Sequence, residues 1–372
     1  MVSSRDPSNP SDNPVVKPIS RFVNLPARSV SDRKQLKRHI PELLWFERLL
    51  QNYDGDYDLR IEHTIKCNGQ ALPLYSLSLG NRIDPLVPTL MLTGGVHGVE
   101  RIGTQVILSW LNSLFERLSW DAELQDKISK LQLVVVPMVN PFGIYNNLRC
   151  NGNGVDLNRN APIDAEDDVP FLLGGHRISN RLPWYRGRSG LDLEEENKAL
   201  ERVIQRHLYS RPFSISLDVH SGFGMKDRLW FPYAFRRKPI GTVDQFLALK
   251  VLWERTFPNH NYEFEPQSNQ YLAHGDLWDY FYLQAQQNSG AKFLPLTLEL
   301  GSWVWVKKRP LQLFNFAGLF NPQKRHRHSR VLRQHLLLFD FLVSAALNFK
   351  NWMPDKNQSV VLTQAAKAMW YK

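Results

Sequence analysis

The chain has 372 residues, of which 43% are apolar and 22% charged, a composition typical of a globular protein. No apolar run reaches the roughly 18 residues that a membrane-spanning helix needs, and the polar, proline-rich start lacks an apolar signal core. The net charge of +10 comes largely from residues 28–38 and 307–333, which carry no nucleic-acid-binding signature and are interpreted as solvated faces. We therefore expect a cytoplasmic protein with no membrane or nucleic-acid partner.

The predicted organisation is a single large domain with short extensions. Residues 1–35 carry isolated apolar residues among Ser, Pro, Asp and Arg, and this pattern indicates a mobile N-terminal arm. Apolar residues at helical spacing predict a helix and turn at 36–58. The main domain is expected at 59–350, followed by a C-terminal tail at 351–372.

The fold class predicted for the main domain is α/β, with a mixed, largely parallel central sheet flanked by helices. Short β-rich runs alternate there with longer amphipathic runs, which is the pattern of such a fold. Between them, residues 161–191 are rich in Gly, Pro and Asp and predict a long surface loop. The predicted strands are 74–79, 89–93, 131–137, 213–219 and 293–300, and the predicted helices are 102–118, 193–208, 243–257 and 331–347.

Two histidines and a carboxylate follow predicted strands, where ligands collect in open α/β sheets. His97 and Glu100 in HGVE are three residues apart, just under one helical turn, so both side chains can reach one ion. His220 ends the apolar run SLDVH. Alone, each motif has an ordinary alternative, a helix cap for HGVE and a buried core histidine for His220. Together they form a set of two imidazoles and one carboxylate that leaves one zinc position open for water.

Two further segments carry chemistry in the same region. Arg149 and Arg159 flank the stretch CNGNGVDLN, and paired guanidinium groups can hold a carboxylate, although such Asn- and Gly-rich segments also form ordinary turns. Glu299 lies at the end of the apolar run LTLEL. A lone carboxylate is costly to bury without a partner, so Glu299 is expected to have a function. The two cysteines, Cys67 and Cys150, cannot form a cysteine-rich zinc module.

Over roughly residues 60–350, the segments HGVE, NPFG, RCNGNGVDLNRN, DVHSG and LTLELG resemble, in this order, the zinc carboxypeptidases of the M14 peptidase family, including its bacterial members. The resemblance implies that one Zn²⁺ is bound by His97, Glu100 and His220, with Glu299 as the catalytic carboxylate. It also implies that Arg149 polarises the scissile carbonyl, that Asn158 and Arg159 hold the substrate's terminal carboxylate, and that Asp156 orients the first histidine.

A further resemblance covers YLAHGDLWDY, which is similar to the tyrosine loop of that family. It implies that Tyr271 is the mobile tyrosine that covers bound substrate, with Tyr262, Tyr280 and Tyr282 as competitors, and that Trp278 sets the side-chain preference. The 161–191 segment departs from the plainest family pattern and could narrow the cleft. Its residues Trp184, Tyr185 and Arg186 are interpreted as surface packing or, less favourably, as substrate contacts.

The resemblance implies a metallocarboxypeptidase that removes the C-terminal residue of a peptide, with Glu299 as general base and then general acid. The substrate would carry a free carboxylate. One alternative is a zinc amidohydrolase of N-acyl amino acids, resembling the aspartoacylase and desuccinylase branch, and another is cleavage of murein peptides. An inactive relative that only binds an anionic partner is a third alternative, although every matching position is filled here.

Overall fold

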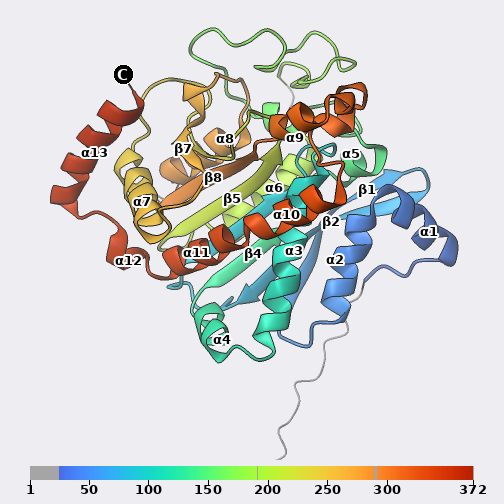
Figure 1. The fold of residues 1–372 in the computed structure, drawn as a ribbon, viewed down its shortest axis with the longest axis horizontal. Coiled ribbons are helices and arrows are strands. Elements are labelled where there is room, and N and C mark those ends of the chain that lie inside the picture. Colours follow the sequence, from blue (N-terminus) through green and yellow to red (C-terminus); the bar gives the residue numbers. More distant parts are fainter. Residues whose placement is uncertain (1–24, 191, 289–290, 372) are drawn as a thin grey trace, which may run out of the picture.

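The computed structural model describes residues 25–190, 192–288 and 291–371, and it contains a central sheet of eight strands with helices on both sides (Figure 1). Most of the predicted arm, residues 1–24, lies outside the described residues. The strands are β1 (Tyr57–Cys67), β2 (Gln70–Gly80), β3 (Thr89–Gly94), β4 (Gln132–Val136), β5 (Ser214–Ser221), β6 (Arg228–Phe231), β7 (Glu263–Pro266) and β8 (Phe293–Leu300).

The sheet order is β1-β2-β4-β3-β5-β8-β6-β7. The four central strands β4, β3, β5 and β8 run parallel, whereas β2 on one side and β6 on the other are antiparallel to the strands that they join. The predicted fold class, a mixed and largely parallel sheet flanked by helices, is confirmed. Because the central strands are parallel, their carboxyl ends meet at one edge of the sheet.

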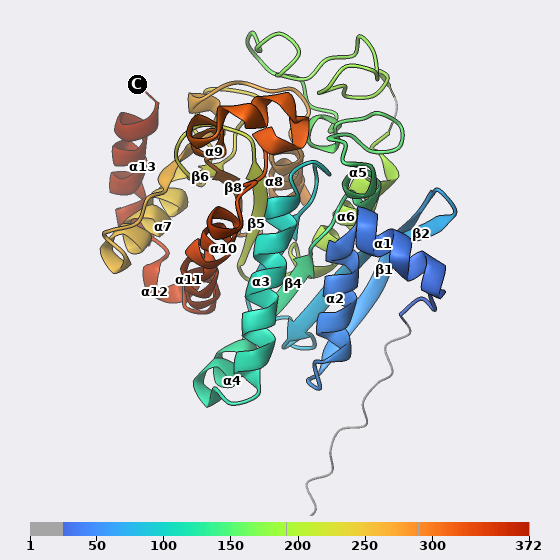
Figure 2. The same cartoon turned by 45° about the vertical axis from the view of Figure 1, so that its right-hand side comes forward.

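Alternate residues of the central strands enter two separate cores. Leu90 and Leu92 of β3 belong to the core on one face, whereas Met91 between them belongs to the core on the other face. The first core is covered by α2 (Pro41–Gln51), α3 (Arg101–Leu118) and α11 (Leu336–Leu347), and the second by α6 (Glu195–His207) and α8 (Leu277–Asn288) (Figures 1 and 2). Burial on both faces explains why these strands read as continuous apolar runs.

The N-terminal part becomes helical earlier than the sequence predicts. Helix α1 (Val30–His39) begins inside the predicted arm, because the Ser29 hydroxyl accepts a hydrogen bond from the Asp32 N–H and the Asp32 carboxylate accepts one from the Ser29 N–H. Pro41 then occupies the first turn of α2, where its missing N–H costs no hydrogen bond. The predicted helix is therefore two helices.

The C-terminal part also departs from the prediction. The single helix expected at 331–347 is two helices, α10 (Arg325–Gln334) and α11, and the expected tail at 351–372 includes α13 (Lys356–Trp370). Helix α13 packs against α7 (Val243–Thr256), and the Trp370 indole N–H donates to the Phe264 carbonyl. The described part of the tail is thus an integral part of the domain.

The predicted surface loop at 161–191 is confirmed: outside residue 191, which is not described, it contains only one isolated β-bridge, between His176 and Tyr185. Among the described residues, no helix has both the length and the apolar character needed to cross a bilayer.

The remaining helices are α4 (Ala122–Ser129), α5 (Pro141–Asn146), α9 (Trp303–Lys308) and α12 (Phe349–Trp352), and the short 3-10 turns are η1 (Leu157–Arg159), η2 (Gln267–Asn269), η3 (Pro310–Phe314) and η4 (Phe316–Leu319).

Candidate active site

His97, Glu100 and His220 come together at the carboxyl ends of β3 and β5. His97 and Glu100 lie in the turn between β3 and α3, where the Glu100 N–H donates to the His97 carbonyl at 3.1 Å. The expected convergence is present, but it is produced by a turn and not by a helix. This turn packs against the NPFG segment so closely that a Cβ on Gly98 would lie 1.9 Å from the Gly143 carbonyl carbon, which explains the glycine in HGVE.

The three side chains form a buried group of potential metal ligands, each less than 5% exposed. The His97 Nδ1 atom is 2.8 Å from Glu100 Oε1 and 3.2 Å from His220 Nδ1, and His220 Nδ1 is 3.1 Å from Glu100 Oε2. The other ring nitrogen of each histidine faces a carboxylate and is therefore the N–H donor. Both Nδ1 lone pairs then point at a third acceptor, the Glu100 carboxylate. Two Nδ1 atoms and a carboxylate this close together can share one cation, so the ligand set fits Zn²⁺.

Carboxylates behind the histidines fix their orientation. His97 Nε2 donates to Asp156 Oδ1 at 2.9 Å, the contact that the family resemblance implies, and His220 Nε2 donates to Asp218 Oδ2 at 2.6 Å. The Trp278 indole N–H donates to the same Asp218 oxygen at 2.9 Å. Such partners fix the tautomer of a metal-binding imidazole and strengthen it as a ligand. The sequence analysis missed Asp218, although its spacing of two from His220 places both on one face of β5.

Arg149 links the two acidic groups on the His97 side. Its Nε donates to Asp156 at 2.7 Å and its Nη1 to Glu100 at 3.0 Å. Burial alone would raise the pKa of Asp156, but the positive charge of Arg149 and the contact with His97 outweigh burial and hold this pKa well below its usual value. The Trp184 ring lies 5.7 Å from the Arg149 guanidinium carbon, so the 161–191 loop reaches the site through this cation–π contact.

Glu299 lies beside His220 because β5 and β8 are hydrogen-bonded neighbours with His220 and Glu299 directly paired. Side chains paired across a sheet point to the same face, so Glu299 faces the metal-ligand group. Its Oε1 accepts the Phe223 N–H at 2.9 Å. Burial, and then the negative charge of Glu100, raise the pKa of Glu299 to about 8. The structure thus places a carboxyl group that holds its proton unusually tightly next to the metal-ligand group.

Arg159, Asn158 and Tyr271 lie together on one side of the ligand group. The Arg159 Nη2 donates to the Tyr271 hydroxyl at 3.4 Å and its Nη1 to the Asn158 carbonyl at 3.0 Å. Among the described residues no carboxylate forms an ion pair with this buried guanidinium. The Asn158 Nδ2 donates to Asp276 at 3.3 Å and has a second hydrogen to offer. A buried cation without an ion pair is suited to an incoming anion.

Tyr271, the predicted substrate-covering tyrosine, lies with its ring next to Phe223 and Trp230. The three competing tyrosines are engaged elsewhere: Tyr262 with His335, Tyr280 with Glu201 and Tyr282 with Thr242.

Trp278 is not placed as a substrate-contacting residue. Its ring is 3% exposed and packs in the second core, and its N–H is used by Asp218. Arg186 is also buried, where it donates to the carbonyls of Arg159 and Ile163 and to Asp164, and so braces the 161–191 loop against the Arg159 backbone. Tyr185 likewise contributes its carbonyl to the Asp156 N–H.

Comparison with known proteins agrees with this geometry. The family model described as zinc carboxypeptidase, Peptidase M14, matches residues 68–303. Carboxypeptidase SOL1 of Arabidopsis thaliana is 30% identical over 250 residues, covering 64% of this chain and 45% of the relative. Carboxypeptidase M of Mus musculus is 29% identical over 243 residues, covering 61% and 51%. The chain therefore spans about half the length of these curated relatives.

Solved structures show the same fold at low sequence identity. The thrombin activatable fibrinolysis inhibitor aligns with a TM-score of 0.60 at 19% identity, covering 82% of this chain and 72% of that one. Carboxypeptidase A from Helicoverpa armigera aligns with a TM-score of 0.55 at 18% identity, covering 87% and 71%. The family match extends over most of the chain and includes His97, Glu100, His220 and Glu299. The chain belongs to the zinc carboxypeptidase family.

Proposed function

We propose that this protein is a zinc-dependent carboxypeptidase that removes the C-terminal residue of a peptide. The observation that carries the proposal is the pairing of His220 with Glu299 across β5 and β8, which sets a basic carboxylate next to a ready-made ligand group for one metal ion. His97, Glu100 and His220 would hold this single Zn²⁺. When bound, Zn²⁺ polarises water and carbonyl groups as a Lewis acid.

Glu299 acts as the general base and then as the general acid. Beside a bound Zn²⁺, the raised pKa of this carboxyl would fall toward neutral, so that the carboxylate could take a proton from water and return it to the leaving amine. The Phe223 N–H holds one carboxylate oxygen, so the other oxygen is left to exchange the proton. The burial of Glu299 reduces competition from bulk solvent.

Arg149 and Arg159 perform two separate tasks. Arg149, which already contacts Glu100, is placed to stabilise the negative oxygen that develops as the carbonyl is attacked. Arg159, with Asn158, holds the terminal carboxylate and so fixes the last amide bond at the reacting centre, while Tyr271 covers the bound residue. Trp278, in contrast, positions His220 through Asp218 and does not select the substrate side chain.

The proposal is tested with N-blocked peptides that differ only in the final residue, together with their C-terminally amidated counterparts. N-acyl amino acids and murein peptides form two further arms. Every arm is measured with zinc, with a chelator, and after zinc is restored. We expect zinc-dependent release of the last residue from the free-acid peptides and much slower release from the amides. Activity on N-acyl amino acids or murein peptides alone, or activity that survives the chelator, would contradict the proposal.

A further inference from the structure

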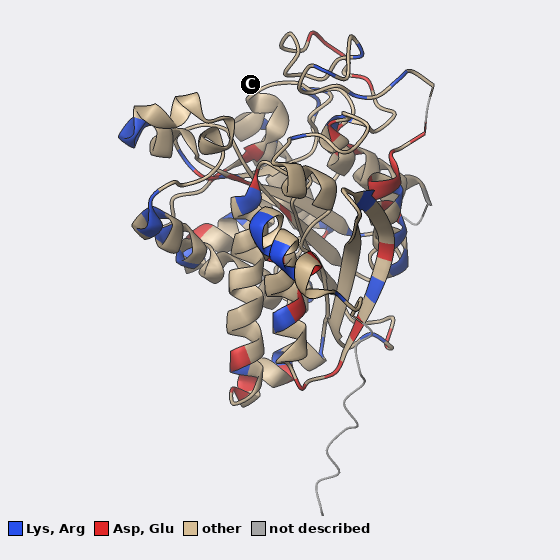
Figure 3. Ribbon diagram, turned by 90° about the vertical axis from the view of Figure 1, so that its right-hand side faces the viewer, with Lys and Arg blue, Asp and Glu red and all other residues tan. Residues whose placement is uncertain are grey.

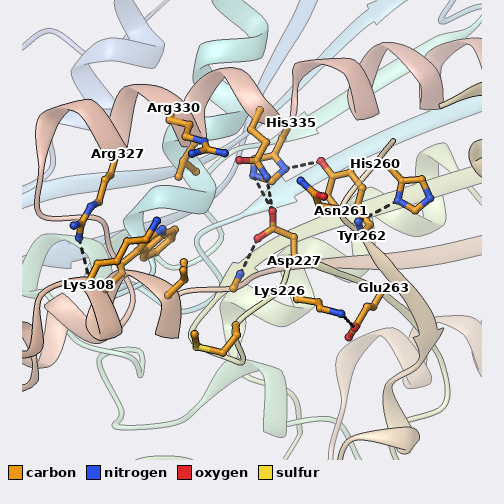
Figure 4. Close-up of a pocket in the computed structure, with 16 residues that line it drawn as sticks. Lys226, Asp227, His260, Asn261, Tyr262, Glu263, Lys308, Arg327, Arg330 and His335 are labelled. Atoms are coloured by element: carbon orange, nitrogen blue, oxygen red, sulfur yellow. Dashed lines mark hydrogen bonds and ion pairs between the residues drawn. The ribbon is translucent and has the colours of Figure 1, made fainter. Parts of the chain in front are cut away.

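A second pocket lies on the α9 and α10 side of the molecule, apart from the metal-ligand group. It has a volume of about 540 Å³, and its lining comes from α9, α10, the loop before β6 and the loop before β7 (Figure 4). This size is in the range that holds a small-molecule ligand. None of the residues assigned above to zinc, to Glu299 or to the substrate clamp lines this pocket.

One end of the pocket is formed by cations without ion-pair partners. Lys308 and Arg327 lie next to each other there, and Arg330 lies above the cavity (Figure 4). Among the described residues no carboxylate lies within ion-pair distance of these three side chains, and Arg327 donates to the Trp305 carbonyl.

The fourth lining cation, Lys226, is paired with Glu263 at 2.7 Å. The lining therefore contains four basic side chains but only two acidic ones, Asp227 and Glu263. Glu263 also forms an ion pair with Arg228 at 2.7 Å, so the negative charge of Glu263 is already neutralised.

The sequence explains why these charges have no partners. Between Glu299 and Asp340 the chain has no Asp or Glu at all, whereas it has eight Lys and Arg residues. Figure 3 shows the basic positions of this stretch along α10. Concentrated like charge opposes folding unless counter-charge is supplied from outside.

The opposite end of the pocket is rigid and carries rings. Tyr262 and His335 are joined by a 2.7 Å hydrogen bond, and Asp227 accepts hydrogen bonds from the Gly301 N–H at 2.9 Å and from Gln334 at 2.6 Å. The burial of His335 lowers its pKa, so the imidazole adds no positive charge there near neutral pH. Tyr262 and His260 offer ring surfaces at this end.

We propose that this pocket binds a small molecule that carries phosphate groups, with the phosphates at Lys308, Arg327 and Arg330. Guanidinium groups match phosphate oxygens with paired hydrogen bonds, and a lysine adds a compact charge. Inorganic polyphosphates supply this chemistry alone, whereas a nucleoside diphosphate adds a ring that fits the Tyr262 and His260 end. The site needs neither zinc nor peptide hydrolysis, so the proposal stands or falls separately from the carboxypeptidase assignment.

The test is titration calorimetry of the intact protein with inorganic pyrophosphate, with ADP and with citrate at constant ionic strength. The variants are Arg330→Gln and Arg327→Gln, and the matched control is Arg333→Gln, on the same helix but outside the pocket. We expect saturable binding of pyrophosphate or ADP that each pocket variant weakens about tenfold, since a charge-assisted hydrogen bond is worth at least that factor. Tighter binding of ADP than of pyrophosphate would identify the ring-bearing source, and equal binding the inorganic one.

Three outcomes would overturn the proposal. One is the absence of saturable binding by either phosphate compound at about 10 mM, which is ten times a Kd of about 1 mM. Another is an equal loss of binding in Arg333→Gln, because that result indicates a diffuse surface charge and not a built site. The third is equal affinity for citrate, which would show that the pocket does not select phosphate.

Discussion

Replacing Glu299 with Gln tests the assignment of the general base directly. The amide has the same shape as the carboxylate, and its oxygen can still accept the Phe223 N–H that lies 2.9 Å from Oε1. The change removes the ability to take up and release a proton, together with the negative charge of the ionised form. Because Glu299 is not one of the three metal ligands, we expect Glu299→Gln to bind zinc in the same ratio as the unchanged protein.

The expected loss of activity follows from what a positioned base contributes. General acid–base catalysis is worth about 10²–10⁴-fold, and here one carboxyl performs both proton transfers, so we expect kcat to fall by several orders of magnitude. We expect KM to change little, because the substrate carboxylate is held by Arg159, a residue that does not contact Glu299 through any hydrogen bond of the described structure.

The assay is hydrolysis of an N-blocked dipeptide with zinc saturation, with metal content measured on the same samples. Glu116→Gln, a carboxylate on the exposed side of α3, is the matched control and should keep full activity. If Glu299→Gln retained more than about a tenth of the original kcat with zinc bound, Glu299 would not be the base and the proton-transfer argument would be wrong.

Arg159→Ala should lower kcat/KM by about 100-fold on free-acid peptides but far less on amides, because it removes charge-assisted contacts to the carboxylate; equal losses would argue against the clamp. Trp278→Phe should weaken zinc binding about tenfold, because Asp218 loses the hydrogen bond from the indole N–H, and it should leave the preferred C-terminal residue unchanged. Metal-buffer titration measures the zinc affinity, and the peptide panel measures the preference. A changed preference with normal zinc affinity would show that Trp278 does select the substrate side chain. In metal-free protein the folded state keeps the Glu299 proton up to about pH 8, whereas the unfolded chain loses it near pH 4.5. The free energy of unfolding should therefore fall as the pH rises between these values, and it should fall less in Glu299→Gln. Urea unfolding in the presence of chelator at pH 5 and 8 measures this change, and an equal change in both proteins would contradict the raised pKa. Trp370→Ala should reduce the free energy of unfolding by about 3–5 kcal/mol, because its ring packs on β6 and β7; a loss below 1 kcal/mol in urea would show that α13 is only loosely attached.

The central strands could be predicted from sequence because burial on both faces leaves an unbroken apolar run. The edge strands could not: β1 carries Asp58, Arg60 and Glu62 with partly exposed residues between them, and its pairing with β2 compensates for a sequence that reads as a surface segment. Helix α8 was not predicted for another reason, because its first residues were interpreted as part of the tyrosine loop.

The metal ligands and Glu299 could be found because each lies at the end of a recognisable strand or just after it. The role of Trp278 could not, since its partner Asp218 lies on a different element and no spacing in the sequence connects the two. The same limit applies to Arg186, which the composition of the loop indicates only as a surface residue but which braces Arg159. Contacts between distant elements are decided by tertiary packing, which a single sequence does not show.

The direct pairing of His220 with Glu299 separates the chemistry of the site from the length of chain between them. Insertions or deletions in the segments that join β5 to β8 leave the two side chains side by side, because the hydrogen bonds of the ladder, and not the intervening residues, hold them at that spacing. A deletion of one residue within β8 before Glu299 would have the opposite effect, since a slip by one position turns every side chain of the strand to the other face. Such a slip would bury the carboxylate among the apolar side chains under α3 and α11. Changes of length between these two strands therefore leave Glu299 beside His220, whereas changes of length inside either strand do not.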